Sequence, residues 1–219
     1  MSLEVPWTGF CNELDILSDQ FRDFATSKPS LSSAAHFDLK DECLLEGLLS
    51  RFWQAWGRFC RSCIVESCLG TTTVAGVGIS ALSGAASEAH VSGAAIRARK
   101  VSTNVWGTTN STLRHEPTWG DVDVLATTIS RLDPGNRAQL LAAFSGGSQS
   151  AKAIQTIRNA ASHHNSQTMT EVGALRPKYI VFQITHPTQS LYWIEPSSQD
   201  FLVIEAAREL RQAALAAVS

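Results

Sequence analysis

The chain has 219 residues, a length between one typical domain and two, and 44% of them are hydrophobic. That fraction supports a substantial core and excludes disorder of the whole chain. Only 17% of the residues are charged, with 18 basic side chains against 20 acidic ones. This balance excludes a nucleic-acid binder that relies on global positive charge, so any contact with RNA or DNA must be local.

The N-terminal third has the spacing of two amphipathic helices. The first is expected over residues 10 to 26, ending before Lys28-Pro29, with its apolar face formed by Phe10, Leu14, Leu17, Phe21 and Phe24. The second is expected to run from a cap at Asp38 or Asp41 to about Cys68, with Gly70 as its C-cap. Its apolar stripe consists of Leu45, Leu49, Phe52, Trp56, Phe59 and Cys63, and Glu46 and Trp53 lie on one flank.

Residues 70–118 are rich in Gly, Ser and Ala and lack a clear helical or strand period. We expect an insertion or loop region there, with one short helix around residues 85 to 100, and a loop this long is often functional. Its end carries a basic cluster, Arg97, Arg99 and Lys100. These side chains could follow a phosphate backbone, and a solvated loop is the alternative.

Helical patterns return after residue 120. We expect one helix capped by Asp121, a second starting at Asp133-Pro134 and closing at Gly146-Gly147, and a third from Ser148 or Ser150. For residues 176–196 we expect a small β-hairpin appendage, with strands Tyr179–Ile184 and Leu191–Ile194. We also expect Ser197 or Ser198 to cap a last helix. The fold class is therefore mainly α, as a single helical domain over residues 1–219.

The most informative motif lies in the third of these helices, where Arg158 and Asn159 are followed by His163. Cleavage of RNA without a metal needs a base for the ribose 2′-hydroxyl and a positive group near the phosphorane. A histidine exchanges protons near neutral pH, and an arginine can hold two phosphate oxygens. Attack by the 2′-hydroxyl leaves a 2′,3′-cyclic phosphate and a 5′-hydroxyl.

The Arg-Asn-x-x-x-His spacing resembles the signature of the HEPN superfamily, all-α domains of which many are metal-independent endoribonucleases. The resemblance implies a HEPN-like helical bundle and a prokaryotic toxin or antiviral-defence effector that cuts RNA, with a neutralising antitoxin or an activating partner protein. It implies Arg158 and His163 as catalytic residues, with Asn159 orienting the histidine or capping the helix. Many small HEPN toxins carry a tyrosine two residues after the histidine, where this chain has Asn165.

On one continuous helix, positions 158 and 163 lie about 140° apart, so one monomer presents the pair poorly on a single face. In HEPN ribonucleases two Arg–His pairs form one cleft in a dimer, so the resemblance implies a homodimer with a composite active site. Glu46 could hold Arg158 in place or be an ordinary solvated glutamate. His164 follows the apolar side of Ile154, Ile157 and Ala161, so we expect it to be buried, with substrate binding as the alternative.

Other motifs favour structural roles. Trp53 and Trp56 could stack on a base, but aromatic residues at helical spacing more often form core. The five cysteines include a Cys60-x-x-Cys63 pair without a second pair at zinc-finger spacing, so reduced buried thiols are expected. The odd number of cysteines, three of them on one expected helix, favours the cytoplasm. No metal or cofactor is expected, and neither a signal peptide nor a membrane-spanning segment is apparent. The rival functions are a catalytically silent HEPN-like module that binds a nucleotide or a partner protein, and a helical regulatory subunit.

Overall fold

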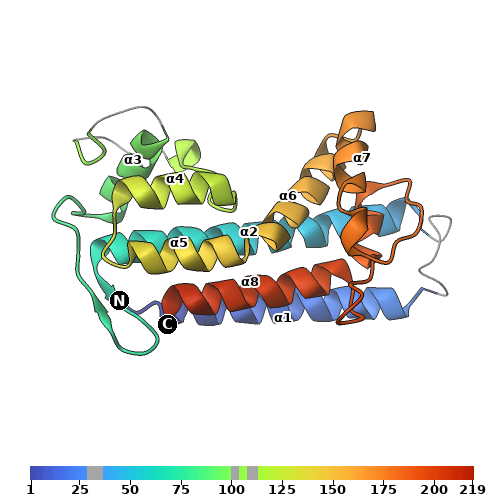
Figure 1. The fold of residues 1–219 in the computed structure, drawn as a ribbon, viewed down its shortest axis with the longest axis horizontal. Coiled ribbons are helices and arrows are strands. Elements are labelled where there is room, and N and C mark those ends of the chain that lie inside the picture. Colours follow the sequence, from blue (N-terminus) through green and yellow to red (C-terminus); the bar gives the residue numbers. More distant parts are fainter. Residues whose placement is uncertain (29–36, 100–103, 108–112) are drawn as a thin grey trace. The chain divides into compact units, whose positions relative to one another are not determined.

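The computed structural model describes residues 1–28, 37–99, 104–107 and 113–219 (Figure 1). The described chain is mainly helical, as predicted. It forms two compact units. The first unit contains Met1–Cys11, Trp56–Ser148 and Arg211–Ser219, and the second contains Asn12–Ala55 and Gln149–Leu210. Helices α1 (Glu4–Thr26), α2 (Leu39–Leu69) and α8 (Leu202–Val218) each contribute residues to both units.

The long helix α2 confirms the predicted stripe and its cap. The amide of Asp41 donates to Asp38 Oδ1 at 3.0 Å, and the amide of Asp38 donates to Asp41 Oδ2 at 2.8 Å. The two aspartates thus cap the helix start reciprocally. Gly70 follows the helix with a φ of +87°, and a Cβ there would lie 2.9 Å from the backbone nitrogen of Ala81. Only glycine fits this position without strain.

In the first unit, α3 (Glu88–Ala98), α4 (Val122–Leu132) and α5 (Arg137–Gly146) lie next to one another (Figure 1). The short strands β1 (Thr71–Thr72) and β2 (Gly78–Ile79) pair antiparallel near both chain termini. Trp56 is fully buried and its ring meets Phe10, Phe59 and Phe144, with centroids 5.7–6.0 Å away. Its indole N–H donates to the carbonyl of Gly120 at 3.2 Å, which satisfies the polar atom of a core residue. Trp56 is therefore core, as expected.

In the second unit, α6 (Ser148–Ser162, of which only Ser148 belongs to the first unit) is followed by α7 (Ser166–Gly173) and the 3₁₀ helices η3 (Arg176–Lys178) and η4 (Pro187–Tyr192). The 3₁₀ turn η2 (Leu113–His115) belongs to the first unit. Aromatic rings form the core of the second unit, with Phe21 4.7 Å and Phe201 5.6 Å from the buried ring of Tyr192. The buried face of α6 consists of Ser150, Ala151, Ala153, Ile154, Ile157 and Ala160.

The predicted C-terminal β-hairpin is wrong. Residues 191 and 192 belong to η4, and only an isolated antiparallel bridge, Ile180 with Ile194, joins the two expected strands. Pro187 and the side-chain cap of His186 start a 3₁₀ helix within the expected connection, and this helix extends into the second run. The strand pair that does form, β1 with β2, lies in the Gly-rich region instead.

Three helix starts also differ from the prediction. Helix α1 begins at Glu4, six residues before the predicted start. Asp133 ends α4 in the left-handed conformation, with a φ of +57°, and α5 begins only at Arg137. Helix α8 begins at Leu202, because Ser198 donates its amide to Glu195 in a preceding turn at 2.6 Å. The other expected elements are found, including α3 and the helix that carries the Arg–His motif.

Candidate functional site

The motif residues lie at the C-terminal end of α6 in the second unit. Arg158 and Asn159 are half-buried, and Arg158 Nη1 donates to Asn159 Oδ1 at 3.3 Å. His163 follows the last helical residue, yet its amide donates to the carbonyl of Asn159 at 2.9 Å. Helical hydrogen bonding therefore continues to His163, so the angular separation expected between Arg158 and His163 applies. The imidazole of His163 is exposed.

The backbone of His163 is held by the start of α7. Its carbonyl accepts a hydrogen bond from Asn165 Nδ2 at 2.8 Å and one from Thr168 Oγ1 at 2.9 Å. Asn165 also caps α7, because its Oδ1 accepts from the amides of Gln167 and Thr168 while Thr168 Oγ1 accepts from the amide of Asn165. Asn165, two residues after His163, is thus a helix cap that fixes the backbone of His163.

His164 is exposed, so the prediction of a buried histidine is wrong. The helical pattern that placed it on the apolar side of α6 does not apply, because α6 ends at Ser162. Its ring instead packs edge to face on His186, with centroids 5.3 Å apart and an interplanar angle of 80°. The structure therefore brings His164 together with a histidine from a distant part of the sequence.

Glu46, on α2, lies against this same His186 rather than against Arg158, with Glu46 Oε1 3.4 Å from His186 Nε2. The amide of Thr188 donates to His186 Nδ1 at 3.4 Å, so the proton of the neutral ring is assigned to Nε2, facing Glu46. Burial lowers the pKa of His186. The neighbouring His164 lowers this pKa further, while the carboxylates of Glu42 and Glu46 oppose the shift. Sequence reasoning missed His186, although a histidine directly before a proline is a plausible helix cap.

The predicted basic cluster belongs to the first unit. Arg97 Nε donates to the carbonyl of Val105 at 2.8 Å, and its Nη2 donates to the carbonyl of Gly107. Arg97 therefore supports the local chain. Arg99 is the exposed C-cap residue of α3, and Lys100 lies outside the described residues.

The cysteines of α2 are free, and Cys60, Cys63 and Cys68 are buried. Burial raises the pKa of all three thiols, to about 12 for Cys68, so they are thiols rather than reactive thiolates at neutral pH. In the part of the chain that the structure describes, no group of three His, Cys, Asp or Glu side chains has a metal-binding arrangement. No described helix combines the length and apolar character needed to cross a membrane.

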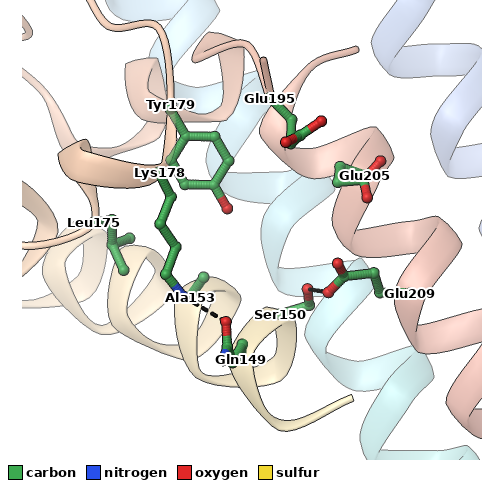
Figure 2. A pocket seen from close by; sticks show the side chains of 9 residues that line it. All are labelled: Gln149, Ser150, Ala153, Leu175, Lys178, Tyr179, Glu195, Glu205 and Glu209. Atoms are coloured by element: carbon green, nitrogen blue, oxygen red, sulfur yellow. Dashed lines mark hydrogen bonds between the residues drawn. The ribbon is translucent and has the colours of Figure 1, made fainter. Parts of the chain in front are cut away.

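A separate pocket of about 320 Å³ lies in the second unit, and sequence reasoning missed it. Figure 2 shows residues of α6, α8 and the segment after α7 around it: Gln149, Ser150, Ala153, Leu175, Lys178, Tyr179, Glu195, Glu205 and Glu209. Lys178 Nζ donates to Gln149 Oε1 at 2.5 Å, and Ser150 Oγ donates to Glu209 Oε2. The spacing of Glu205 and Glu209 places both on one helix face. This pair of carboxylates was the sequence pattern from which the pocket could have been predicted.

Comparisons with protein-family models, curated proteins and solved structures give no significant match. Function must therefore be argued from the residues themselves. The second unit offers two chemically different places, the Arg–His motif at the end of α6 and the acidic pocket near the start of the same helix.

Proposed function

We propose that the protein is a metal-independent endoribonuclease in which Arg158 and His163 act on the scissile phosphate. One observation best supports this proposal. The imidazole of His163 is exposed, while the backbone carbonyl of the same residue is held by hydrogen bonds from Asn165 and Thr168. An exposed ring on a fixed backbone can reach a polymeric substrate and still be positioned for proton transfer.

In the proposed reaction, His163 takes the proton of a ribose 2′-hydroxyl. The 2′-oxygen attacks phosphorus, the bond to the 5′-oxygen breaks, and the leaving oxygen takes up a proton. The guanidinium of Arg158 neutralises the charge that develops on the phosphate oxygens. Asn159 accepts a hydrogen bond from Arg158, and this contact supports a role for Asn159 in positioning the arginine instead of the histidine.

The proposal extends to a homodimer. Arg158 and His163 point in different directions from one helix, so a second copy of the chain would supply the complementary group across a shared cleft. A histidine from each chain would then provide one base and one acid, as the reaction needs. Arg99 remains a candidate for RNA contact, whereas Arg97 bonds to backbone carbonyls. We extend the proposal to a role as a toxin or antiviral-defence effector.

The test is incubation of the purified chain with total RNA in EDTA, beside Arg158→Ala and His163→Ala. We expect cleavage by the wild type and a loss of about 100-fold or more in each variant, the usual scale for a positioned acid–base group. The matched controls are Arg176→Ala and His115→Ala, which remove exposed residues outside the motif and should leave the rate unchanged.

The products identify the chemistry, because 2′-hydroxyl attack leaves 2′,3′-cyclic phosphate ends. Cleavage that persists in both motif variants would contradict the assignment of the site. Intact RNA with every protein would favour the rival binding module. Growth arrest on expression of the wild type, relieved by His163→Ala, is the expected result in cells for a toxin.

A further inference from the structure

The pocket of Figure 2 has the size of a small-molecule site. Its volume of about 320 Å³ lies at the lower end of the range for such sites, roughly 300–1,000 Å³. Its walls are helices α6 and α8 and the chain around Tyr179, all within the second unit. A single small molecule, or one side chain of another protein, would fill it.

The carboxylates of the pocket are not all matched by basic groups. Glu205 has a side chain only 9% exposed, and both of its oxygens accept from Arg208. Lys178 donates to the amide oxygen of Gln149 instead of to a carboxylate. Arg208 also attracts Glu195 and Glu209 electrostatically, but it donates its hydrogen bonds to Glu205. Within the described part of the chain, Glu195 and Glu209 accept hydrogen bonds from neutral groups, which include Ser198 and Ser150.

Tyr179 adds a polar group that lacks a protein partner. It is half-buried, and its hydroxyl makes no hydrogen bond to any described residue; in Figure 2 it points towards the side where the glutamates of α8 lie. Burial raises the pKa of Tyr179 to about 12, with Glu209, Glu205 and Glu195 adding to the shift. The phenol therefore stays neutral, and the negative potential of three carboxylates converges on it.

We propose that this pocket binds a small organic cation, whose amine or guanidinium group is held by Glu195 and Glu209 against the Tyr179 side chain. The two carboxylates accept charge-assisted hydrogen bonds from the cation. The phenol oxygen accepts another, and the aromatic ring offers a cation–π face. The same negative field disfavours a phosphate, so this site is distinct from the proposed RNA site and does not depend on it.

The probe for the test is butylguanidinium, titrated into the full chain by calorimetry. Butylurea has nearly the same shape without the charge, and we expect it not to bind. Glu209→Gln and Glu195→Gln should each weaken binding by about tenfold, the scale of a charge-assisted hydrogen bond. Tyr179→Phe should weaken it less. Lys178→Met should tighten it, because a positive charge leaves the pocket rim.

The matched control is Glu171→Gln, an exposed glutamate of α7 in the same unit, which should bind like the wild type. Circular dichroism establishes that each variant is folded. The proposal is overturned if butylguanidinium gives no signal at millimolar concentration, if butylurea binds equally well, or if Glu171→Gln matches the pocket variants. Because the readout is binding without RNA, a failed ribonuclease test leaves this result unaffected.

Two sources can supply the same cationic group. An acetylated and amidated Gly-Arg-Gly peptide distinguishes them. Binding of butylguanidinium alone assigns a free small molecule, and binding of both probes assigns an arginine side chain of a partner protein. Either result supports the cation site.

Discussion

At the scale of single residues, the surroundings of His186 in the second unit favour the neutral imidazole with its proton on Nε2. His186 has a side chain only 12% exposed, its Nδ1 accepts a hydrogen bond from the amide of Thr188, and its Nε2 lies 3.4 Å from Glu46 Oε1. Because Nδ1 accepts, the neutral ring carries its proton on Nε2, which faces Glu46. Protonation of Nδ1 would remove the hydrogen bond that caps η4, so the local structure and the lowered pKa agree.

The pKa of His186 predicts how stability changes with pH. Because the pKa is lowered in the folded state, the unfolded chain binds more protons as the pH falls through the ordinary value of about 6.5. The free energy of unfolding should therefore fall from neutral pH down to the lowered folded pKa. His186→Asn keeps a capping acceptor and removes the titration, so it should lose less stability over this range.

Urea unfolding of both proteins at about pH 7.5 and about pH 5.5 measures this difference. The neighbouring titratable groups, Glu42, Glu46 and His164, are present in both proteins, so their direct contributions largely cancel. Equal pH dependence in the two proteins would show that His186 does not carry the effect.

At the scale of elements, the junction of α6 and α7 depends on one side chain. Asn165→Ala removes the cap of α7 and the bond to the carbonyl of His163. We expect the free energy of unfolding to fall by about 1 kcal/mol, within the range of measured N-cap losses. Asn165→Asp keeps the capping oxygen and loses only the Nδ2 donor, so its loss should be smaller. Denaturant unfolding provides the measurement.

Gln167→Ala is the control for this junction. It lies in the same turn, and its exposed side chain donates to Glu171, while its backbone amide, which the substitution keeps, donates to Asn165 Oδ1. A change within about 0.5 kcal/mol is expected for such a surface position. If Asn165→Ala is as stable as the wild type, the cap does not hold the chain beside His163.

Helix periodicity predicted most elements because an apolar face repeats along the chain. The stripe from Leu45 to Cys63 is buried at every predicted position, and the spacing alone contains that information. Boundaries failed where a local hydrogen bond decided the outcome. Asp133 is the C-cap of α4 in the left-handed conformation instead of the predicted N-cap, and His186 caps a 3₁₀ helix where a hairpin connection was predicted. In both places the predicted and the observed conformations are similar in local energy.

The site was predictable only where its residues are close in the sequence. Arg158, Asn159 and His163 were found from their spacing, while the partner of Glu46 was not, because His186 lies 140 residues away along the chain. The pocket brings Ser150 against Glu209 and Tyr179 near three glutamates. Such contacts depend on how helices pack, and no periodic pattern records them.

At the scale of the whole molecule, the arrangement of charge favours a local RNA site. The chain carries slightly more acidic than basic side chains, and α6 has acidic surroundings at Ser150 but Arg158 near its other end. The two positions are eight helical steps apart, which spans about 12 Å along the helix. The proposed RNA site at the end of α6 is therefore separated from the acidic pocket, and the proposed dimer would double the arginines and histidines that face one phosphate.

The proposed dimer predicts a specific result when subunits are mixed. Equal amounts of wild type and His163→Ala, unfolded and refolded together, should give dimers of which about one quarter carry two wild-type chains. If each cleft needs both histidines, RNA cleavage falls to about one quarter of the wild-type rate at the same total concentration. Independent active sites would retain about half.

Light scattering tests the mass of the wild type, and affinity tags on the two chains show that mixed dimers have formed. His115→Ala, mixed in the same way, should leave the rate at the wild-type level. A linear loss of activity with the share of His163→Ala, or a monomeric mass under the assay conditions, would contradict a composite cleft. Arg158 and His163 of one chain would then have to reach the same phosphate from sides of the helix that lie about 140° apart. The helical hydrogen bonding at the end of α6 makes this arrangement unfavourable.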